Sequence, residues 1–327
     1  MNKNNQNSSI AFVICTRNNE EKLKTSLQRA LDYLTPNISV YIIDQSKIEN
    51  FHALNHSSSH GRKIVYVHVP HQRGHSVAKN TALKLITEDV IAWTDDDCLI
   101  TNSYVRELNV IARESNRLRD EKIAGVCGQT RPYLKTKPLG SYDCPCTFGK
   151  QDSALVGHVC AHNEHVGLGN NMVLFKQAFN KLGVFKEWLG VGSIGENGDD
   201  GEFMIRCLIS NYKFMYNHNL IIYHNKWLDE DQQKKQSRLY KCGGLVLYGY
   251  YTFSGVEGCK EIFKREINDS IGLIKTYIKN MFSRPQLLHK ILYEAILETS
   301  TLCKGVFLAY WYSKTDKLIT LNKITRD

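Results

Sequence analysis

The sequence predicts an α/β fold with a mostly parallel central sheet flanked by helices, followed by a helical C-terminal region. Two observations predict it. Strand-like and helix-like segments alternate through the first half of the chain, which is typical of βαβ units. Beyond about Leu228 the pattern is purely helical. The length of 327 residues suits one large α/β domain with a smaller helical region.

The elements of the first half follow in a regular order. Short apolar or β-branched runs predict strands, and apolar residues at helical spacing, such as Leu23, Leu27 and Leu31, predict helices. The expected strands are 9–15, 39–43, 63–69, 90–94 and 123–129, and the expected helices are 20–34, 76–86 and 103–119.

The second half is less regular. Residues 131–165 contain three prolines and predict a loop, and the glycine-rich residues 189–198 predict a flexible loop. A helix at 202–210 and a hairpin of 213–216 with 220–223, ending at His224, are expected next. The resulting division is a disordered tail at 1–8, an α/β domain at 9–228 with halves 9–130 and 131–228, and a helical region at 229–327.

The composition is that of a folded protein with a basic excess. Lysine and arginine exceed aspartate and glutamate by 42 to 33, a net charge of +9, which suits an anionic ligand or membrane surface. No run of five basic residues indicates nucleic acid, and we expect none as a partner. No apolar stretch resembles a signal peptide or reaches the ~20 residues of a membrane span. We therefore expect a cytoplasmic protein.

The C-terminal region carries an apolar helical stripe that includes Ile262, Ile271 and Ile278, with lysines on the other side. A basic amphipathic helix can pack on the rest of the protein or lie on a membrane. The pattern favours packing, and peripheral contact with the inner face of the membrane is the alternative.

A second open question concerns a cluster of cysteines and histidines. Zinc is one interpretation, but the C-x-C spacing of the first two cysteines is tighter than a usual zinc knuckle, so ordinary free thiols are favoured. The cluster consists of Cys144, Cys146, His158, Cys160, His162 and His165.

Polar clusters follow three of the expected strands. Ligands of parallel α/β sheets bind at the carboxyl ends of the strands, so we expect one shared site there. The clusters are Thr16-Arg17-Asn18, Asp44-Gln45-Ser46 and Asp95-Asp96-Asp97.

Asp95-Asp96-Asp97 is the first candidate for chemistry. Three adjacent carboxylates repel one another unless a cation lies among them, and Mg²⁺ and Mn²⁺ prefer such oxygen ligands. An acidic loop or a helix N-cap is the plainer alternative.

A second acidic cluster, Asp199-Asp200-Gly201-Glu202, opens a helix. Helix capping explains carboxylates there, but the preceding glycine-rich loop resembles a flap over a substrate. Asp200 could act as a general base, and His224 after a late strand could join a metal shell. Arg73 and Lys79 flank a glycine turn that could approach an anion.

Together these segments resemble the family 2 glycosyltransferases, which have the Rossmann-like GT-A fold. The resemblance covers roughly residues 9–228, with seven motifs in the expected order. They are 14–18 (ICTRN), 42–46 (IIDQS), 73–80 (RGHSVAKN), 93–97 (WTDDD), 167–172 (GLGNNM), 199–206 (DDGEFMIR) and 223–224 (YH).

The resemblance implies an inverting transfer from a UDP-, GDP- or dTDP-sugar to a hydroxyl of a glycan or lipid-linked acceptor. It implies Mn²⁺ or Mg²⁺ as cofactor and Asp97 and His224 as metal ligands. It also implies Asp200 as the catalytic base, with Asp199 as the second catalytic residue shaping its site. Asn170, Asn171 and Arg206 would lie on the acceptor side. The donor would be held by Thr16, Arg17, Asn18, Asp44, Arg73, Lys79, Asp95 and Asp96.

The sequence departs from the family pattern at three positions. Asp199 replaces the usual glutamate, Gln45 stands at an often acidic position, and Lys79 replaces a common arginine. Because of these departures, the resemblance does not identify the nucleotide base or the sugar of the donor.

Two other functions remain as alternatives. A nucleotidyltransferase that makes sugar nucleotides would also use carboxylates and Mg²⁺, but the first turn, Thr16-Arg17-Asn18-Asn19, lacks the glycine expected of its phosphate loop. A non-catalytic scaffold that binds polyanions through the net positive charge is the second.

Overall fold

The computed structural model describes residues 8–50, 61–134, 138–141, 143–159 and 166–316. Most of the expected N-terminal tail, and Cys160, His162 and His165, lie outside these ranges. The strands are β1 (Ile10–Thr16), β2 (Ile38–Asp44), β3 (Ile64–His68), β4 (Val90–Asp95), β5 (Cys98–Ile100), β6 (Ile123–Pro132), β7 (Ala154–Val156), β8 (Met172–Phe175) and β9 (Lys213–His224). The α-helices are α1 (Glu20–Tyr33), α2 (His75–Leu85), α3 (Asn102–Asp120), α4 (Lys176–Leu182), α5 (Asp199–Ile209), α6 (Glu230–Phe253), α7 (Glu257–Ser283) and α8 (Leu288–Thr315).

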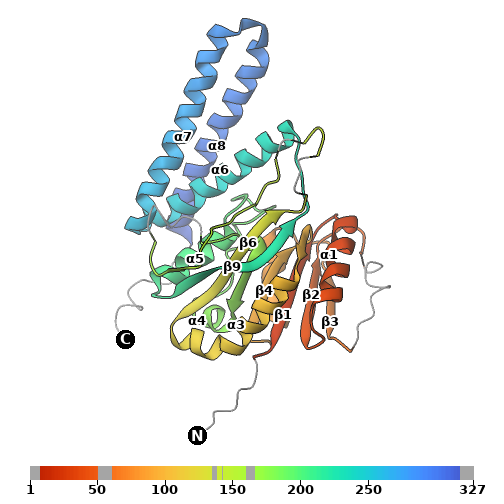
Figure 1. Cartoon of the computed structure of the whole chain (residues 1–327). Helices are drawn as coiled ribbons and strands as arrows, with labels where there is room; N and C mark the ends of the chain where they lie inside the picture. The colour runs from red at the N-terminus through yellow and green to blue at the C-terminus, as the bar shows by residue number, and fades with distance from the viewer. Residues whose placement is uncertain (1–7, 51–60, 135–137, 142, 160–165, 317–327) are drawn as a thin grey trace.

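One mixed sheet forms the centre of the molecule (Figure 1). Its strand order is β3-β2-β1-β4-β8-β6-β9-β5, and β7 pairs with β9. The four strands from β3 to β4 are parallel, as are β6 and β9. This confirms the predicted α/β fold, into which β8 is inserted antiparallel to both its neighbours.

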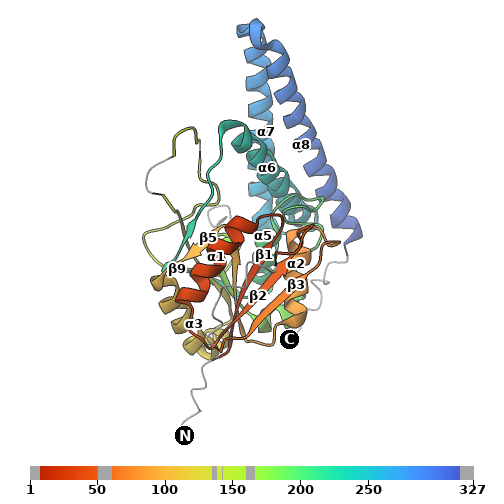
Figure 2. The same ribbon diagram turned by 90° about the vertical axis from the view of Figure 1, so that its right-hand side faces the viewer.

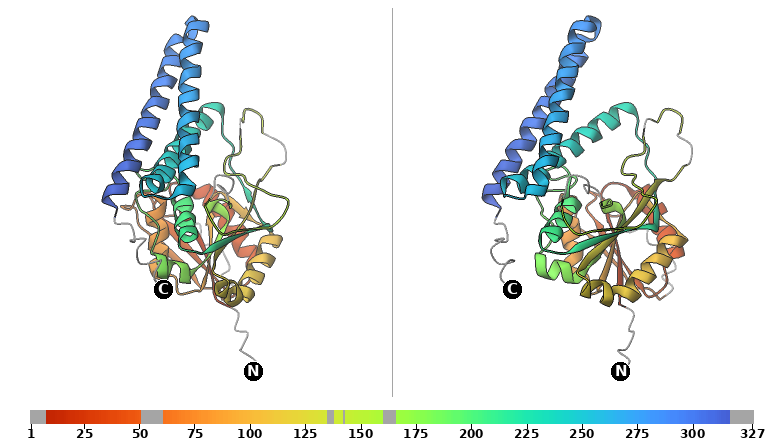
Figure 3. Two further views of the ribbon diagram at one scale, coloured as in Figure 1. Left: turned by 90° about the vertical axis from the view of Figure 1, so that its left-hand side faces the viewer. Right: turned by 60° about the vertical axis from the view of Figure 1, so that its left-hand side comes forward.

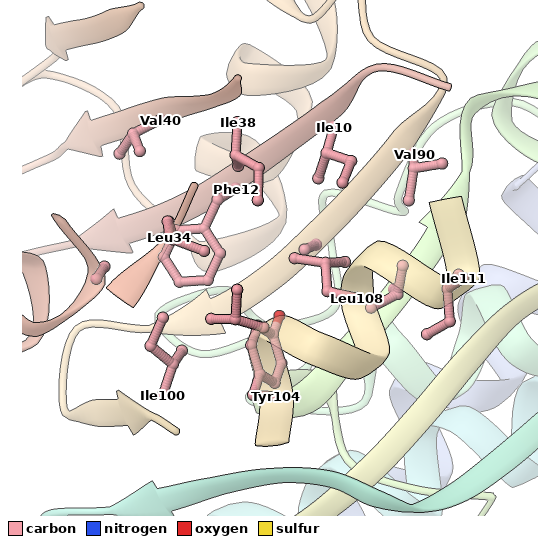
Figure 4. Close-up of a cluster of buried hydrophobic side chains, with 14 of the residues drawn as sticks. Ile10, Phe12, Leu34, Ile38, Val40, Val90, Ile100, Tyr104, Leu108 and Ile111 are labelled. Carbon is pink, nitrogen blue, oxygen red and sulfur yellow. The ribbon is translucent and has the colours of Figure 1, made fainter. Parts of the chain in front are cut away.

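Alternation along β1 explains why helices cover both faces of the sheet. Ile10, Phe12 and Ile14 face a core shared with α1 and α3, whereas Ala11 and Val13 face a core shared with α2, α4 and α5. Successive side chains of a strand point to opposite faces, so a strand buried on both sides is apolar throughout. Figure 4 shows the first of these cores, where the rings of Phe12 and Tyr104 meet edge to face.

The end of the α/β domain differs from the sequence prediction. The expected hairpin of 213–216 with 220–223 is wrong, because residues 213–224 form the single strand β9. β9 runs along β6 with a register shift after Gly128, and this bulge absorbs the polar residues between the two apolar runs. The predicted loop 131–165 also contains a short strand, β7.

The C-terminal helices follow the sheet as one unit. α6 packs between the α/β domain and the antiparallel pair of α7 and α8, which projects away from the sheet (Figures 2 and 3). A third apolar cluster joins Leu189 and Ile205 of the α/β domain to Val246, Tyr250 and Tyr251 of α6. Within the described ranges, no helix combines the length and apolar character needed to span a bilayer.

Candidate active site

The three polar clusters lie side by side at one edge of the sheet. The parallel register pairs Thr16 at the end of β1 with Asp44 at the end of β2. On the other side of β1, Cys15 pairs with Asp95 at the end of β4. The sequence prediction that these strand ends share one location is therefore confirmed by the strand register.

Asp95, Asp96 and Asp97 crowd together at this edge. Thr16 Oγ1 and Asn19 Nδ2 donate to the two carboxylate oxygens of Asp96, at 2.6 and 2.8 Å. Burial, together with the charge of Asp97, raises the pKa of Asp96 to about 7. Burial also raises the pKa of Asp95. A divalent cation at this edge would stabilise the ionised forms of Asp95 and Asp96, whose pKa values are raised.

Asp97 faces His224 because β5 pairs with β9. The antiparallel register sets Cys98, next to Asp97, opposite His224, and His224 Nε2 lies 3.2 Å from Asp97 Oδ1. Burial tends to raise the pKa of Asp97, but the hydrogen bond and charge of His224 outweigh it and lower that pKa. In the same way, Asp97 outweighs the burial of His224 and raises the pKa of His224 to about 10.

The donor set at Asp97 and His224 fits a divalent ion. Asp97, Cys98 and His224 each offer a ligand atom, all within 4.8 Å of one another. His224 Nδ1 donates to the carbonyl oxygen of Pro145 at 2.5 Å, which leaves Nε2 pointing at Asp97. Burial raises the pKa of the Cys98 thiol well above its ordinary value, and Mg²⁺ and Mn²⁺ prefer oxygen and nitrogen ligands such as Asp97 and His224.

Helix α2 joins the two acidic segments. Lys79 Nζ donates to Asp199 Oδ2 at 2.9 Å, and both side chains are buried. His75, at the start of the same helix, lies 3.8 Å from Asp95 Oδ1 through Nε2 and 3.7 Å from Asp199 Oδ2 through Nδ1. Burial lowers the pKa of His75, as does nearby Lys79, so the imidazole is neutral at neutral pH. The end of β4 and the start of α5 therefore border one site.

Asp199 and Asp200 have different surroundings. Asp199 is buried, and Lys79 and His75 outweigh the effect of burial and lower its pKa. Asp200 is only partly buried, and the backbone N–H of Gly169 donates to its Oδ2 at 2.6 Å. A Cβ atom at position 169 would lie 2.6 Å from that oxygen, so the approach requires glycine. Asp200 thus has one oriented oxygen and, among the described residues, an Oδ1 without a hydrogen-bond donor.

The glycine-rich loop 189–198 covers the start of α2. The backbone N–H of His75 donates to the carbonyl oxygen of Val191 at 2.9 Å, and the hydroxyl of Ser76 donates to that of Leu189. Gly190 has a φ of +101°, and a Cβ there would lie 2.6 Å from Ser76 Oγ and 3.1 Å from Asp199 Cγ. The space between the loop and Asp199 therefore leaves no room for a side chain at position 190.

The predicted donor-side residues have varied surroundings. Arg17 and Arg73 are exposed, and neither forms an ion pair with any residue that the structure describes. Asn18 instead binds the loop after β2, where the N–H of Lys47 donates to its Oδ1 at 3.0 Å. The buried carboxylate of Asp44 accepts hydrogen bonds from Ser46 N, Asn50 N and Tyr66 Oη.

The predicted acceptor-side residues mainly hold neighbouring segments. Asn170 accepts from Thr130 and donates to the carbonyl oxygen of Cys146, and Asn171 donates to those of Gln129 and Leu220. Arg206 pairs with Glu202 and donates to the carbonyl oxygens of Leu182 and Val184. The structure therefore places Arg206 in the framework behind Asp200.

Three residues of the site were not singled out from the sequence. They are His75, Gly169 and Asn19, each within or next to a motif that was recognised. His75 at the start of a helix and Gly169 before two asparagines could have been noted in the sequence. Their contacts could not, because the residues that they contact lie far away in the chain.

The described part of the cysteine and histidine cluster has separate partners. Cys144 Sγ lies 3.8 Å from His224 Nδ1, whereas Cys146 Sγ contacts Tyr240 Oη at 2.5 Å. His158 is exposed. Cys144 therefore lies next to His224 rather than beside Cys146.

Comparison with known proteins agrees with this geometry. A search of curated proteins finds no sequence match. Among solved structures, the mannosyltransferase PcManGT from Pyrobaculum calidifontis, in complex with GDP-Man and Mn²⁺, shares 12% identity at a TM-score of 0.55, covering 95% of this chain and 88% of its own. Residues 1–349 of S. aureus TarS share 12% identity at a TM-score of 0.53, covering 93% and 90%.

At these identities the two structures show a common GT-A fold. The sequence itself adds the family, because residues 11–183 match the model of glycosyl transferase family 2. The matched segment includes β1, the end of β2, the Asp95-Asp96-Asp97 cluster and Gly169. Because it spans more than half of the chain, this protein belongs to glycosyl transferase family 2.

Proposed function

We propose that this chain is an inverting, metal-dependent glycosyltransferase with Asp200 as its general base. The observation that carries the proposal is the contact of His75 with both Asp95 and Asp199. It brings the acidic end of β4, suited to a cation and a diphosphate, next to the start of α5, which carries Asp200.

The donor half is residues 9–130 in this proposal. Asp97 and His224 would hold Mn²⁺ or Mg²⁺, which neutralises charge on the departing nucleoside diphosphate. The exposed guanidinium groups of Arg17 and Arg73 add positive charge for the same phosphates. The nucleotide side of the site consists of Thr16, Arg17, Asn18, Asp44, Arg73, Lys79, Asp95 and Asp96.

Asp200 takes the proton of the acceptor hydroxyl through its unbonded oxygen. Gly169 holds the other oxygen, so the carboxylate is oriented before the acceptor arrives. The hydroxyl oxygen forms a bond to the anomeric carbon as the bond to the diphosphate breaks. One displacement inverts the anomeric configuration, whereas retention would require a carboxylate nucleophile as well.

The acceptor half is residues 131–228, with Asn170, Asn171 and Arg206 shaping its wall. A glycan or a lipid-linked sugar supplies the hydroxyl in this proposal, at the cytoplasmic face of a membrane. PcManGT binds GDP-Man and Mn²⁺, so GDP-sugars are the first donors to test, followed by UDP- and dTDP-sugars.

The test is donor turnover by the full chain and by Asp200→Asn. Release of nucleoside diphosphate from each nucleotide sugar is measured with Mn²⁺, with Mg²⁺ and with chelator. We expect the substitution to lower turnover about 10²- to 10⁴-fold, the usual contribution of a general base. Asp120→Asn, at the far end of α3, is the matched control and should keep full activity.

Two results would contradict the proposal. If Asp200→Asn leaves turnover unchanged, Asp200 is not the general base. Release of pyrophosphate from nucleoside triphosphate and sugar phosphate would instead identify a nucleotidyltransferase.

A further inference from the structure

Helices α7 and α8 form a hairpin whose turn lies at one extremity of the molecule. Figures 1 and 2 show it rising beyond the sheet, with the start of β1 at the opposite end of the molecule. α7 has 27 residues and α8 has 28. At 1.5 Å per residue such helices are about 40 Å long, so the turn lies far from the sheet.

The charges at this turn have one sign. Residues 275–293, hereafter the hairpin tip, contain four lysines and arginines and no aspartate or glutamate. Lys275, Lys279, Arg284 and Lys290 are all exposed, and none is in an ion pair with a residue that the structure describes. The acidic groups that act on the tip are already paired: Glu230 of α6 with Lys234 at 2.6 Å, and Glu294 and Glu298 of α8 with Arg238 and Lys241.

The same tip exposes large apolar side chains. Phe282 is 84% exposed and Tyr293 is 61% exposed, the first on α7 and the second on α8. Ile278, Leu287, Leu288 and Leu292 are exposed beside them. Aromatic and aliphatic side chains interleaved with cations are the composition of segments that enter the headgroup region of a bilayer.

In the remainder of the hairpin, unlike in the tip, several charged side chains are in ion pairs. Glu294 and Glu298 of α8 pair with Arg238 and Lys241 of α6 at 2.7 and 2.8 Å. Near the base of α7, Lys264 pairs with Glu261 at 3.0 Å. Charge is balanced where the hairpin meets α6, and the imbalance is confined to the end that projects.

We propose that the hairpin tip docks on the surface of an anionic lipid bilayer. The uncompensated cations meet lipid phosphates while Phe282 and its apolar neighbours enter the interface. A second copy of the chain is a poorer partner, because the four cations of one tip would repel the four cations of the other. The inference uses no residue of the candidate active site and does not depend on the proposed function.

The experiment measures binding of the full chain to vesicles by co-sedimentation. Vesicles of phosphatidylcholine alone are compared with vesicles in which about one third is phosphatidylglycerol, at low and high salt. We expect binding to the anionic vesicles alone, weakening as salt rises. At roughly fivefold for each cation, the triple variant Lys279→Gln, Arg284→Gln, Lys290→Gln should bind about 100-fold more weakly.

A matched control removes the same charge from the opposite end of the hairpin. Lys260→Gln, Lys264→Gln, Lys314→Gln replaces three exposed lysines there and should keep binding within about threefold. For the apolar contribution, Phe282→Ser should weaken binding about tenfold. Phe307→Ser, at a residue 62% exposed, should leave binding unchanged. Thermal unfolding of every variant confirms that it is folded.

Three outcomes would overturn the proposal. The first is a wild type that does not bind anionic vesicles, or that binds neutral ones equally well. The second is an equal loss of binding in the tip and control variants, which would make net charge the cause. Sedimentation of the wild type as a dimer that Phe282→Ser converts to a monomer, without vesicle binding, would make the tip a self-association surface.

Discussion

Lys79 is the residue on which the charge balance of the site depends. It is buried beside Asp199, Asp200 and Asp95, whose charges outweigh the effect of burial and raise its pKa. The pKa of Asp199 is lowered in return. A buried pair of this kind contributes little as a whole, but removing one partner leaves the other charge buried and unpaired.

We therefore expect Lys79→Gln to lower the free energy of unfolding by about 3 kcal/mol. Asp199→Asn should have a similar cost, and the double variant should cost less than the sum, by about 1–3 kcal/mol. Because the pKa of Asp199 is lowered, its contribution is present above its ordinary pKa of 3.8 and is lost as the pH falls below it. Urea unfolding at neutral and acidic pH measures all three variants, and strictly additive costs would contradict this account.

At this scale the sequence indicates candidate residues but not their hydrogen-bond partners. Asp97, Asp200 and His224 could be named as candidates because a carboxylate after a strand, a carboxylate at a helix start and a late histidine suit a metal or a base. That Lys79 would pair with Asp199, or Asn19 with Asp96, could not be predicted, because each contact depends on how α2 and the loop after β1 pack across the sheet edge. Arg206 carries a motif position yet bonds to Glu202 within its own helix.

Among the elements, the glycine-rich loop 189–198 has the most restricted geometry. It lies against α2 through Val191 and Leu189, and its conformation at Gly190 is one that other residues rarely adopt. A side chain at position 190 would press on Ser76 and Asp199 together. A change in the position of this loop would therefore alter its contact with Asp199 at the start of α5.

Gly190→Ala should lower donor turnover at least tenfold, because the loop must move away from Asp199. Gly255→Ala is its control. Gly255 has a similar φ of +89° but has open space around it, in the turn between α6 and α7. The control should share the backbone cost of about 1–2 kcal/mol in stability and keep its activity. Equal activities for the two variants would show that the contact with Asp199 does not matter.

Except for β5, the elements of the donor half could be predicted from the sequence because their strands are continuous runs of apolar or β-branched residues. β9 could not, because the polar residues 217–219 separate two apolar runs that continue across a bulge in a single strand. β5 and β7 are three residues long, too short for any periodicity to register.

For the molecule as a whole, the C-terminal helices complete the fold. Leu189 and Ile205 of the α/β domain are buried by α6, and the ring of Trp188 stacks on Tyr312 of α8 at 4.1 Å. The sequence favoured packing on the rest of the protein for the isoleucine stripe, which lies on α7, whereas the helix that packs on the α/β domain is α6. α7 contacts α6 and α8 rather than the sheet, which the stripe of isoleucines alone could not distinguish.

A chain ending at Leu228 should therefore be unstable. Exposing two or more side chains of the third apolar cluster costs roughly 3–6 kcal/mol, a large part of the 5–15 kcal/mol that holds a typical domain folded. Soluble yield and thermal unfolding of residues 1–228 measure it against the full chain. An unchanged melting temperature would show that the helices are a separable domain.

The pairing of β5 with β9 has a consequence for the order in which this protein comes into being. Asp97 is translated early and His224 late, and only the closing strand of the sheet brings them within reach of one ion. A nascent chain that has emerged as far as α3 contains Asp95, Asp96 and Asp97 but does not yet contain His224. If Asp97 and His224 hold the proposed cation, its capture would require that β9 has already joined the sheet, and a polypeptide released before then would lack the site.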